Sequence, residues 1–276
     1  MSRPAGACTD RSPANGFTLI ELAVTLFIVT LLLGSVLIPL QTQVETHKIE
    51  ETQRILEQAR EALLGYAASF GYFPCPADAT SAGMEPPPPA GPPPALGTDH
   101  SDGRCATYNG FLPAALLGFT PVDAEGFALD AWGGAAATRI RYAVSNHPVG
   151  ASPLPFTTAG GMALAGIPAL ASNTNLIYVC GSGAGVVADT NCGPPPAQRL
   201  ASNVVAVIWS SGANAVAGGT SVHEAQNPNV NVAPSQDRIF VSRVRVSSGP
   251  DEFDDQLIWI SGFQVVSRLL ASGQLP

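Results

Sequence analysis

The chain has 276 residues, a hydrophobic content of 46%, a charged content of 12% and a formal net charge of −8. This balance excludes an intrinsically disordered chain, which lacks enough apolar side chains to form a core, and the length allows one or two domains. It also excludes a nucleic-acid surface, because neutralising phosphates needs clustered lysines and arginines, whereas Lys48 is the single lysine of the sequence.

The N-terminal region contains an apolar run over residues 17–40 that holds one carboxylate, Glu21. A helix of about 20 residues crosses the hydrocarbon core of a bilayer, so this run is long enough to span a membrane. An ionised side chain at that depth costs about 2.5–3.5 kcal/mol on insertion scales, and such a residue usually marks a function. We therefore expect Glu21 to have a cationic partner at the same depth.

Two other interpretations of the N-terminus fit less well. A cleaved secretory signal has a shorter apolar core than this run. The stretch that ends at Cys8 resembles a lipoprotein acylation site, but no apolar segment precedes it. Because Arg3 and Arg11 precede the run and acids such as Glu45 follow it, the positive-inside rule predicts a cytoplasmic N-terminus, with everything beyond residue 40 outside the inner membrane.

A short hydrophilic leader precedes the segment Gly16-Phe17-Thr18-Leu19-Ile20-Glu21-Leu22. This segment closely resembles the processing site of type IV pilins and of the pseudopilins of type II secretion. The resemblance implies that a prepilin peptidase removes residues 1–16 by cutting after Gly16, and that Phe17 becomes the N-methylated first residue. Glycine suits such a cut because it lets a protease approach the backbone closely. Family leaders often carry a basic residue beside the glycine, where this chain has Asn15.

The cut would create a free amine at membrane level, which is the cation that Glu21 lacks. Within one helix the amine of Phe17 and the carboxylate of Glu21 lie about one turn apart, so an intramolecular pair is conceivable. The resemblance implies an intermolecular pair, in which Glu21 of an incoming subunit faces the amine of a neighbour and sets the axial stagger of a filament. An unprocessed anchor with a stray glutamate is the remaining alternative.

The resemblance implies a structural subunit and no enzyme. The size of the head suggests a minor pilin or minor pseudopilin, anchored in the bacterial inner membrane with a periplasmic head and then built into a filament. Its implied partners are the membrane, other pilin or pseudopilin subunits, the prepilin peptidase, an inner-membrane platform protein and an assembly ATPase. Two alternatives from other classes are a binding subunit (adhesin) at a pilus tip and a membrane-tethered periplasmic enzyme that does not polymerise.

The helix is expected to continue past the membrane over residues 41–70. Apolar side chains recur there at steps of three and four residues, the pattern of an amphipathic helix, and Gly71 and Pro74 mark its end. The stripe consists of Ile55, Ala59, Leu63, Tyr66 and Phe70. Such a stripe needs a sheet or a helical bundle to cover it.

Residues 41–276 are expected to form one pilin-like head of the α+β class, in which this long N-terminal helix packs on an antiparallel sheet. Strand patterns without intervening helical patterns support this prediction, and they cover residues 139–145, 175–181, 203–210, 238–246 and 256–266. The proline-rich segment 86–97 cannot form a helix or a central strand, so we expect a stiff surface insertion there.

Two further segments, YNGFLP over residues 108–113 and LDAWG over residues 129–133, resemble the loop that follows the long helix of the major pseudopilin. In that family a D-P-W-G stretch introduces the sheet, and here Ala131 replaces the proline. The similarity favours a pseudopilin-like head over an adhesin-like one.

The cysteines fit an oxidising compartment. Cys8 would leave with the leader, and the four that remain allow three pairings: Cys75, Cys105, Cys180 and Cys192. The simplest pairing joins neighbours, Cys75 with Cys105 and Cys180 with Cys192, and each bond would contribute on the order of 3 kcal/mol. A zinc site lacks support, because the chain has no C-x-x-C and no nearby Cys and His.

No catalytic motif is present. The four histidines are dispersed, and the sequence lacks H-E-x-x-H, G-x-S-x-G and the phosphate-binding G-x-x-x-x-G-K. A Ser, His and Asp from distant positions could still meet in space, and sequence alone does not test this. The prediction is therefore a protein without enzymatic activity.

An acidic loop over residues 251–255 is the one candidate metal site. Asp251, Asp254 and Asp255 supply hard oxygen ligands beside Gly249 and Pro250, a donor set that suits Ca²⁺. Major pseudopilins resemble the chain in carrying calcium in a late loop, although the spacing here matches no EF-hand. The alternative is a solvated turn whose aspartates accept hydrogen bonds from local backbone amides.

Overall fold

The structure is a computed structural model that describes residues 17–88, 103–134, 136–187, 192–194, 198–216, 219, 221–227 and 238–275, without the side chains of residues 35–41. The chain divides into two compact units, Met1–His47 and Lys48–Pro276. The predicted leader over residues 1–16 lies outside the described residues, and so does most of the predicted insertion over residues 86–97.

The first element is the helix α1 (Leu19–Phe70), which has 52 residues. It ends where the sequence predicts, because Gly71 adopts a φ of +78° that other residues rarely take. There the backbone N–H of Gly71 donates to the carbonyl of Ala67 at 2.8 Å, which closes the last turn. The predicted long N-terminal helix is confirmed.

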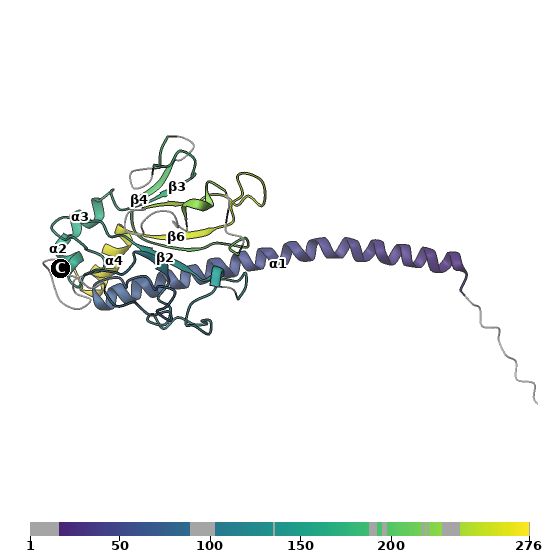
Figure 1. The fold of residues 1–276 in the computed structure, drawn as a ribbon, viewed down its shortest axis with the longest axis horizontal. Helices are drawn as coiled ribbons and strands as arrows, with labels where there is room; N and C mark the ends of the chain where they lie inside the picture. Colours follow the sequence, from purple (N-terminus) through teal and green to yellow (C-terminus); the bar gives the residue numbers. More distant parts are fainter. Residues whose placement is uncertain are drawn as a thin grey trace, which may run out of the picture. The chain divides into compact units, whose positions relative to one another are not determined.

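The head, Lys48–Pro276, contains a six-stranded sheet with the order β1-β2-β4-β3-β5, in which β6 also pairs with β4 (Figure 1). Its strands are β1 (Asn109–Phe111), β2 (Arg141–Val144), β3 (Ile177–Cys180), β4 (Arg199–Ser210), β5 (Ile239–Val241) and β6 (Gln256–Ser261). The α+β class is confirmed, but the sheet is mixed, because β3 and β5 pair in parallel. The predicted strand over residues 238–246 forms only its first part, as β5.

One face of the sheet holds the main core. In the head, Leu56 and Leu63 of α1 pack in one buried cluster with Tyr142 of β2, Ile208 of β4 and Ile260 of β6. The hydroxyl of Tyr142 donates to the carbonyl of Pro74 at 3.1 Å, so its polar atom is satisfied within the core. The predicted stripe is confirmed at Ala59 and Leu63, but Phe70 is 56% exposed, and the buried face of the helix runs instead through Leu56, Leu64 and Ala67. The opposite face carries a second cluster around Trp209 and Phe240.

The last helix, α4 (Gly262–Ser272), corrects the predicted strand over residues 256–266. The strand ends at Ser261, whose hydroxyl accepts the backbone N–H of Gln264, while the side chain of Gln264 accepts the backbone N–H of Ser261. This capping box starts a helix in spite of the β-branched Val265 and Val266. Gly262 permits the change of direction, since a Cβ there would lie 2.4 Å from Asn203 Oδ1.

Short helices fill the connections. α2 (Gly161–Ala165) and α3 (Ile167–Ser172) lie between β2 and β3, where the sequence predicted no helix. The 3₁₀ turns are η2 (Ala136–Thr138) before β2 and η3 (Glu224–Gln226) between β4 and β5. Segments of three to six residues are too short to show a hydrophobic period, which is why pattern analysis misses them.

Leu63 tests the core. Its side chain is fully buried in α1, so Leu63→Ala keeps helix propensity but leaves a cavity, and the free energy of unfolding should fall by about 2–5 kcal/mol. Val244→Ala, at a residue that is 85% exposed, should change it by less than about 0.5 kcal/mol. Denaturant unfolding of the detergent-solubilised chain measures both, and equal effects would contradict the packing.

Candidate functional site

The N-terminal motif lies at the start of α1. Glu21 is the acidic residue of the first turn, and its backbone N–H donates to the hydroxyl of Thr18 at 3.3 Å. This bond satisfies one of the N–H groups that a helix start leaves unpaired. Within the described part of the chain, Glu21 belongs to none of the ion pairs. Gly16 lies outside the described residues.

The first part of α1 exposes its apolar side chains. Every residue from 17 to 34 is exposed, with Leu19 at 87% and Phe27 at 67%. Soluble monomers rarely present a contiguous apolar surface of this kind unless it contacts a protein or a membrane. Among the helical residues that the structure describes, no stretch has both the length and the apolar character needed to cross a membrane.

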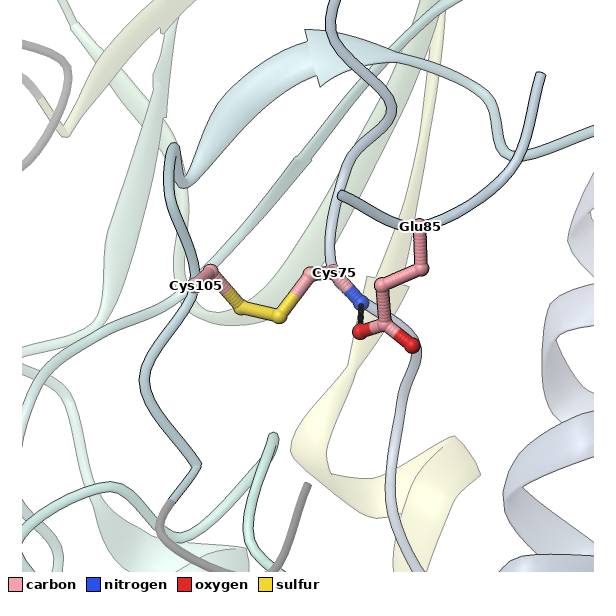
Figure 2. Close-up of side chains that lie close together, drawn as sticks. All are labelled: Cys75, Glu85 and Cys105. Carbon is pink, nitrogen blue, oxygen red and sulfur yellow. Dashed lines mark hydrogen bonds between the residues drawn. A yellow bond between two sulfur atoms is a disulfide. The ribbon is translucent and has the colours of Figure 1, made fainter. Parts of the chain in front are cut away.

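Two disulfides lie in the head. They join Cys75 to Cys105 and Cys180 to Cys192, which are the neighbour pairs that the sequence analysis placed first. Figure 2 shows the first disulfide together with Glu85. The side chains of these three residues lie close enough for a shared metal ion, but metals bind thiolates, and both cysteines are consumed in the disulfide.

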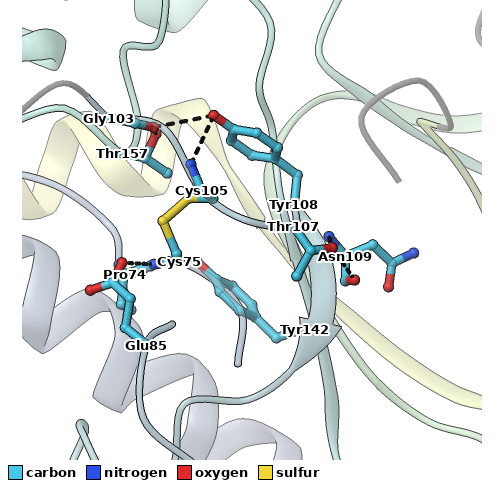
Figure 3. Close-up of a disulfide and its surroundings, with 10 residues drawn as sticks. All are labelled: Pro74, Cys75, Glu85, Gly103, Cys105, Thr107, Tyr108, Asn109, Tyr142 and Thr157. Atoms are coloured by element: carbon cyan, nitrogen blue, oxygen red, sulfur yellow. Dashed lines mark hydrogen bonds between the residues drawn. A yellow bond between two sulfur atoms is a disulfide. The ribbon is translucent and has the colours of Figure 1, made fainter. Parts of the chain in front are cut away.

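Glu85 is held against this disulfide. Its carboxylate accepts the backbone N–H of Cys75 at 2.6 Å (Figures 2 and 3). Burial raises the pKa of Glu85 to about 7, against the opposing effect of this hydrogen bond. On the other side, the hydroxyl of Tyr108 accepts the N–H of Cys105 at 3.3 Å and donates to the carbonyl of Gly103 at 3.2 Å (Figure 3). Both ends of the disulfide-closed loop are therefore anchored.

A second cluster brings three carboxylates together from two segments. Glu224 is the first residue of η3, and Asp254 and Asp255 immediately precede β6. Each offers an oxygen within 4.8 Å of the other two. Glu224 is 2% exposed and Asp254 6%, whereas Asp255 is partly buried. This carboxylate cluster is the candidate metal centre of the head.

Backbone and amide donors fix two members of the carboxylate cluster. Asp254 Oδ2 accepts the backbone N–H groups of Ala213 at 2.8 Å and Asn214 at 3.0 Å. Glu224 Oε1 accepts the side-chain amide of Asn214 at 3.0 Å and the backbone N–H of Asp254 at 3.0 Å. The close approach requires Gly212, because a Cβ there would lie 2.5 Å from the carboxyl carbon of Asp254.

Asn227 holds the third member. Its side-chain amide donates to Asp255 Oδ2 at 2.6 Å and to the carbonyl of Val241 at 3.0 Å, while its Oδ1 accepts the N–H of Val241 at 2.7 Å. The side-chain amide of Asn227 thus bonds both backbone groups of Val241, as a neighbouring strand would, and holds Asp255 next to β5.

Two oxygens of the carboxylate cluster accept no hydrogen bond from the described residues. Among the described residues, Glu224 Oε2 and Asp254 Oδ1 are buried without a hydrogen-bond partner. Burial raises the pKa of Glu224, Asp254 and Asp255, the last to about 8. Neighbouring carboxylates add to the rise at Glu224 and Asp255, whereas a side-chain hydrogen bond with Glu224 lowers the pKa of Asp254. Arg245 favours the ionised form of Asp254. Buried polar atoms nearly always have a partner, so the cluster requires either protons or a cation.

The geometry fits a calcium-sized ion. Calcium binds six to eight oxygens at about 2.3–2.6 Å, so ligands on opposite sides lie about 4.6–5.2 Å apart. Each of the three carboxylates offers an oxygen within 4.8 Å of the other two, so the three oxygens lie close enough together to contact one such ion. A hard cation such as Ca²⁺ is coordinated by oxygen ligands, and carboxylate oxygens without a hydrogen-bond partner can serve as these ligands.

The predicted ligand set is only partly brought together. Asp254 and Asp255 lie in the carboxylate cluster, but Asp251 does not: its carboxylate lies 3.2 Å from His223 Nε2. Glu224 takes the place that the sequence analysis gave to Asp251. The reason is that the backbones of Val246 and Phe253 exchange two hydrogen bonds of 2.9 Å, which places Asp251 in the turn between them with its side chain 68% exposed.

A Ser, His and Asp do meet in space. His223 lies between Asp251 and Ser182, with Ser182 Oγ 3.4 Å from His223 Nδ1. The same Nδ1 accepts the backbone N–H of Gly183 at 2.9 Å, and Ser182 is 4% exposed. The lone pair that would activate the serine is therefore already engaged, and the buried hydroxyl lacks access for a substrate. This arrangement ties loops together and does not form a nucleophile.

Asp130, in the LDAWG segment, connects this region to α1. Its carboxylate accepts the N–H of Trp132 at 2.9 Å and the hydroxyl of Ser210 at 2.5 Å, and burial raises the pKa of Asp130 to about 6. The next residue, Ala131, donates its N–H to the hydroxyl of Thr52 at 3.2 Å. The segment therefore joins α1 to the end of β4.

Sequence analysis missed Glu224. This residue precedes Asp254 by 30 positions, and a glutamate in a Gly- and Asn-rich stretch gives no signal of burial. The available signal was the net negative charge of the loop, which has four acids in five residues and no nearby lysine. Such a charge favours a bound cation but does not indicate which acid from another segment joins the loop.

Comparison with known proteins identifies the N-terminus alone. Residues 11–37 match the prokaryotic N-terminal methylation motif, the prepilin-type signature of type IV pilins and pseudopilins. No curated protein and no solved structure matches the chain significantly. The chain therefore carries the signature that the resemblance indicated, and its fold is consistent with a pilin-like head.

Glu85 gives a test of the disulfide-closed loop. Because its pKa rises from 4.5 to about 7 on folding, the folded chain binds this proton more tightly than the unfolded chain does. The free energy of unfolding should therefore fall as pH rises from about 4.5 to about 7. Glu85→Gln should remove part of this slope, measured by urea unfolding at several pH values. The exposed control Glu50→Gln should keep the slope, and an unchanged slope in Glu85→Gln would refute the assignment.

Proposed function

We propose that the chain is a structural subunit of a type IV pilus or of a type II secretion pseudopilus, and that it polymerises through the first part of α1. The methylation motif at residues 11–37 is the observation that carries the proposal. The motif supports a type IV pilin-like or pseudopilin-like protein, and the size of the head favours a minor subunit.

The exposed apolar surface supplies the driving force. Burying one Leu, Ile or Phe side chain contributes about 1.5–3 kcal/mol, and α1 exposes such side chains throughout residues 17–33. In the membrane, lipid covers this surface before assembly; in the filament, the same surface of neighbouring subunits covers it. The same apolar surface therefore holds the subunit in the inner membrane before assembly and packs against neighbouring subunits in the filament.

Glu21 supplies the specificity. A carboxylate within this apolar surface is costly wherever it lacks a cation. Cleavage after Gly16 creates a positive amine on Phe17, and pairing it with Glu21 of a neighbouring subunit removes both unpaired charges. The amine and the carboxylate can meet at only one axial position of one subunit relative to the next, so the pair sets the stagger between subunits.

The remaining partners follow from this route. A prepilin peptidase cleaves and methylates the chain at the inner membrane, with residues 1–16 in the cytoplasm and the head in the periplasm. The resemblance to pilins implies that an inner-membrane platform protein and a cytoplasmic ATPase supply the energy for extracting the subunit. The two disulfides fit an oxidising compartment. In this role the chain turns over no substrate.

Glu21→Ala separates assembly from processing. The variant should be inserted and cleaved normally, because the cut lies five residues earlier, but its incorporation into filaments should be lost. Immunoblotting of sheared filaments against the membrane fraction measures the incorporated share.

A matched control is Glu50→Ala, which removes a carboxylate elsewhere on α1. Filaments should contain this variant at the wild-type level. If Glu21→Ala were incorporated as well as Glu50→Ala, the charge pair would not be the basis of assembly.

We also infer that the carboxylate cluster of the head binds Ca²⁺. The observation that favours this second role is the pair of buried oxygens without a partner, Glu224 Oε2 and Asp254 Oδ1. Glu224, Asp254 and Asp255 would hold the ion, and its charge would offset the repulsion between them. The ion would link η3 to the start of β6 and so stabilise the head.

Calcium should raise the melting temperature of the detergent-solubilised chain. At a concentration 100 times the dissociation constant, the expected stabilisation is about 2.7 kcal/mol. Asp254→Asn should abolish the shift, whereas Glu252→Gln, a neighbouring acid outside the carboxylate cluster, should retain it. Thermal unfolding in EDTA, CaCl₂ and MgCl₂ checks this, and an equal shift in Asp254→Asn would contradict the site.

A further inference from the structure

We infer that Glu85 accepts the proton of the Cys75 thiol when the disulfide between Cys75 and Cys105 forms. The bond joins the end of α1 to the edge of the sheet, because Cys75 lies shortly after α1 and Cys105 shortly before β1. It closes a segment with a sequence separation of 30. The inference concerns how the head matures and is independent of what the mature head assembles with.

Glu85 lies beside both sulfur atoms. One of its carboxylate oxygens and the two Sγ atoms lie within 4.8 Å of one another. In Figures 2 and 3, Cys75 lies between Cys105 and Glu85, so a Cys75 thiol that is released from the disulfide can turn toward the carboxylate. A base must reach the proton directly or through one water molecule, and two hydrogen bonds of about 2.8 Å span this distance.

Cys75 itself fixes the position of the carboxylate. Its backbone N–H donates to Glu85 Oε1 at 2.6 Å, so the acid is held by the residue whose side chain it would deprotonate. Cys75 is 1% exposed and Cys105 is 6% exposed. Hydroxide and buffer bases from solution therefore have little access to the Cys75 thiol, and an acceptor inside the head replaces them.

The proton transfer adds no charge to this region. The carboxylate becomes neutral as the thiol becomes a thiolate, whereas a thiolate beside an ionised Glu85 would place two like charges together. Burial raises the pKa of Glu85 to about 7, near the pKa of about 8.5 of an ordinary thiol, so the transfer costs little free energy. Tyr66 of α1 and Tyr142 of β2 also interact with Glu85, and burial raises the pKa of both, so they are neutral near pH 7.

A small-molecule disulfide such as oxidised glutathione serves as the oxidant. The thiolate of Cys105, the more exposed cysteine, attacks one glutathione sulfur; a mixed disulfide forms, and the first glutathione leaves as a thiolate that takes up the Cys105 proton. The Cys75 thiol then gives its proton to Glu85, and its sulfur attacks Cys105 Sγ. The mixed disulfide breaks, and the second glutathione leaves with the proton that Glu85 returns. Two cysteine thiols are oxidised, and one oxidised glutathione is reduced to two thiols.

Reoxidation of the full-length chain in detergent tests the inference. The chain is reduced with a dithiol without denaturant, the dithiol is removed, and excess oxidised glutathione is added. Acid quenching, alkylation of the remaining thiols and mass spectrometry give the closure rate of each disulfide. At pH 7, Glu85→Gln should close the Cys75–Cys105 bond at least about tenfold more slowly than the wild type, because proton transfer to a positioned side chain typically contributes at least that much.

This variant keeps the structural role of the residue. The glutamine oxygen still accepts the N–H of Cys75, but an amide does not take up the proton. The Cys180–Cys192 bond of the same molecules is the internal control, and its closure rate should be unchanged. Glu50→Gln, which removes an exposed acid of α1, should close both bonds at wild-type rates.

The pH dependence separates a proton acceptor from a residue that only supports the loop. In the wild type, the closure rate of Cys75–Cys105 should rise with pH and level off above about 7, where Glu85 is ionised. In Glu85→Gln it should continue to rise up to the thiol pKa of about 8.5, so the difference between the two proteins should narrow at high pH. A purely structural effect would slow closure by the same factor at every pH.

The inference is overturned if Glu85→Gln closes the Cys75–Cys105 bond at the wild-type rate at pH 7, which is also the result expected if the reduced chain does not keep Glu85 beside Cys75. It is equally overturned if the variant slows both disulfides alike, or slows Cys75–Cys105 by a factor that does not depend on pH. A loss of rate that is confined to Cys75–Cys105 and narrows at high pH supports it.

Discussion

One carboxylate, Glu21, lies on the exposed apolar surface of α1, and the proposed assembly depends on how its charge is paired. Glu21 interrupts a surface that must be covered by lipid or by protein, and in the described chain it forms no ion pair. A nonspecific apolar contact between two helices allows many axial registers. A pair of opposite charges allows only the register that brings the two charges together. In the proposed function, cleavage after Gly16 would supply this partner, and electrostatics would then link processing to polymerisation.

The same physics acts in the head on a smaller scale. Burial penalises the charges of Glu224, Asp254 and Asp255, and the hydrogen bonds from Ala213, Asn214 and Asn227 compensate only some of their oxygens. A chain that keeps several buried carboxylates together retains them at a cost in stability unless an ion or a proton offsets it. In both units of the chain, the proposed function therefore starts from a carboxylate whose charge the described residues do not compensate.

Sequence patterns predicted the features that depend on long or specific signals. The apolar periodicity through Leu63 predicted the second part of α1, and the neighbour pairs were the simplest of the three pairings that four cysteines allow. The patterns failed where short-range interactions decide. The capping box of Ser261 and Gln264 ended β6 earlier than the hydrophobic run suggested, and the parallel pairing of β3 with β5 left no trace in either strand. Glu224 joined the acidic loop through tertiary structure alone, because a turn directs Asp251 outward.

The N-terminus of the protein in its own membrane tests the central claim most directly. Mass spectrometry of the purified chain should show a first residue of Phe17 that carries one added methyl group on its amine. That result would establish the cation which Glu21 requires. A chain that begins intact at Met1, in cells with an active prepilin peptidase, would contradict the account, since Glu21 would then lack the partner on which assembly depends.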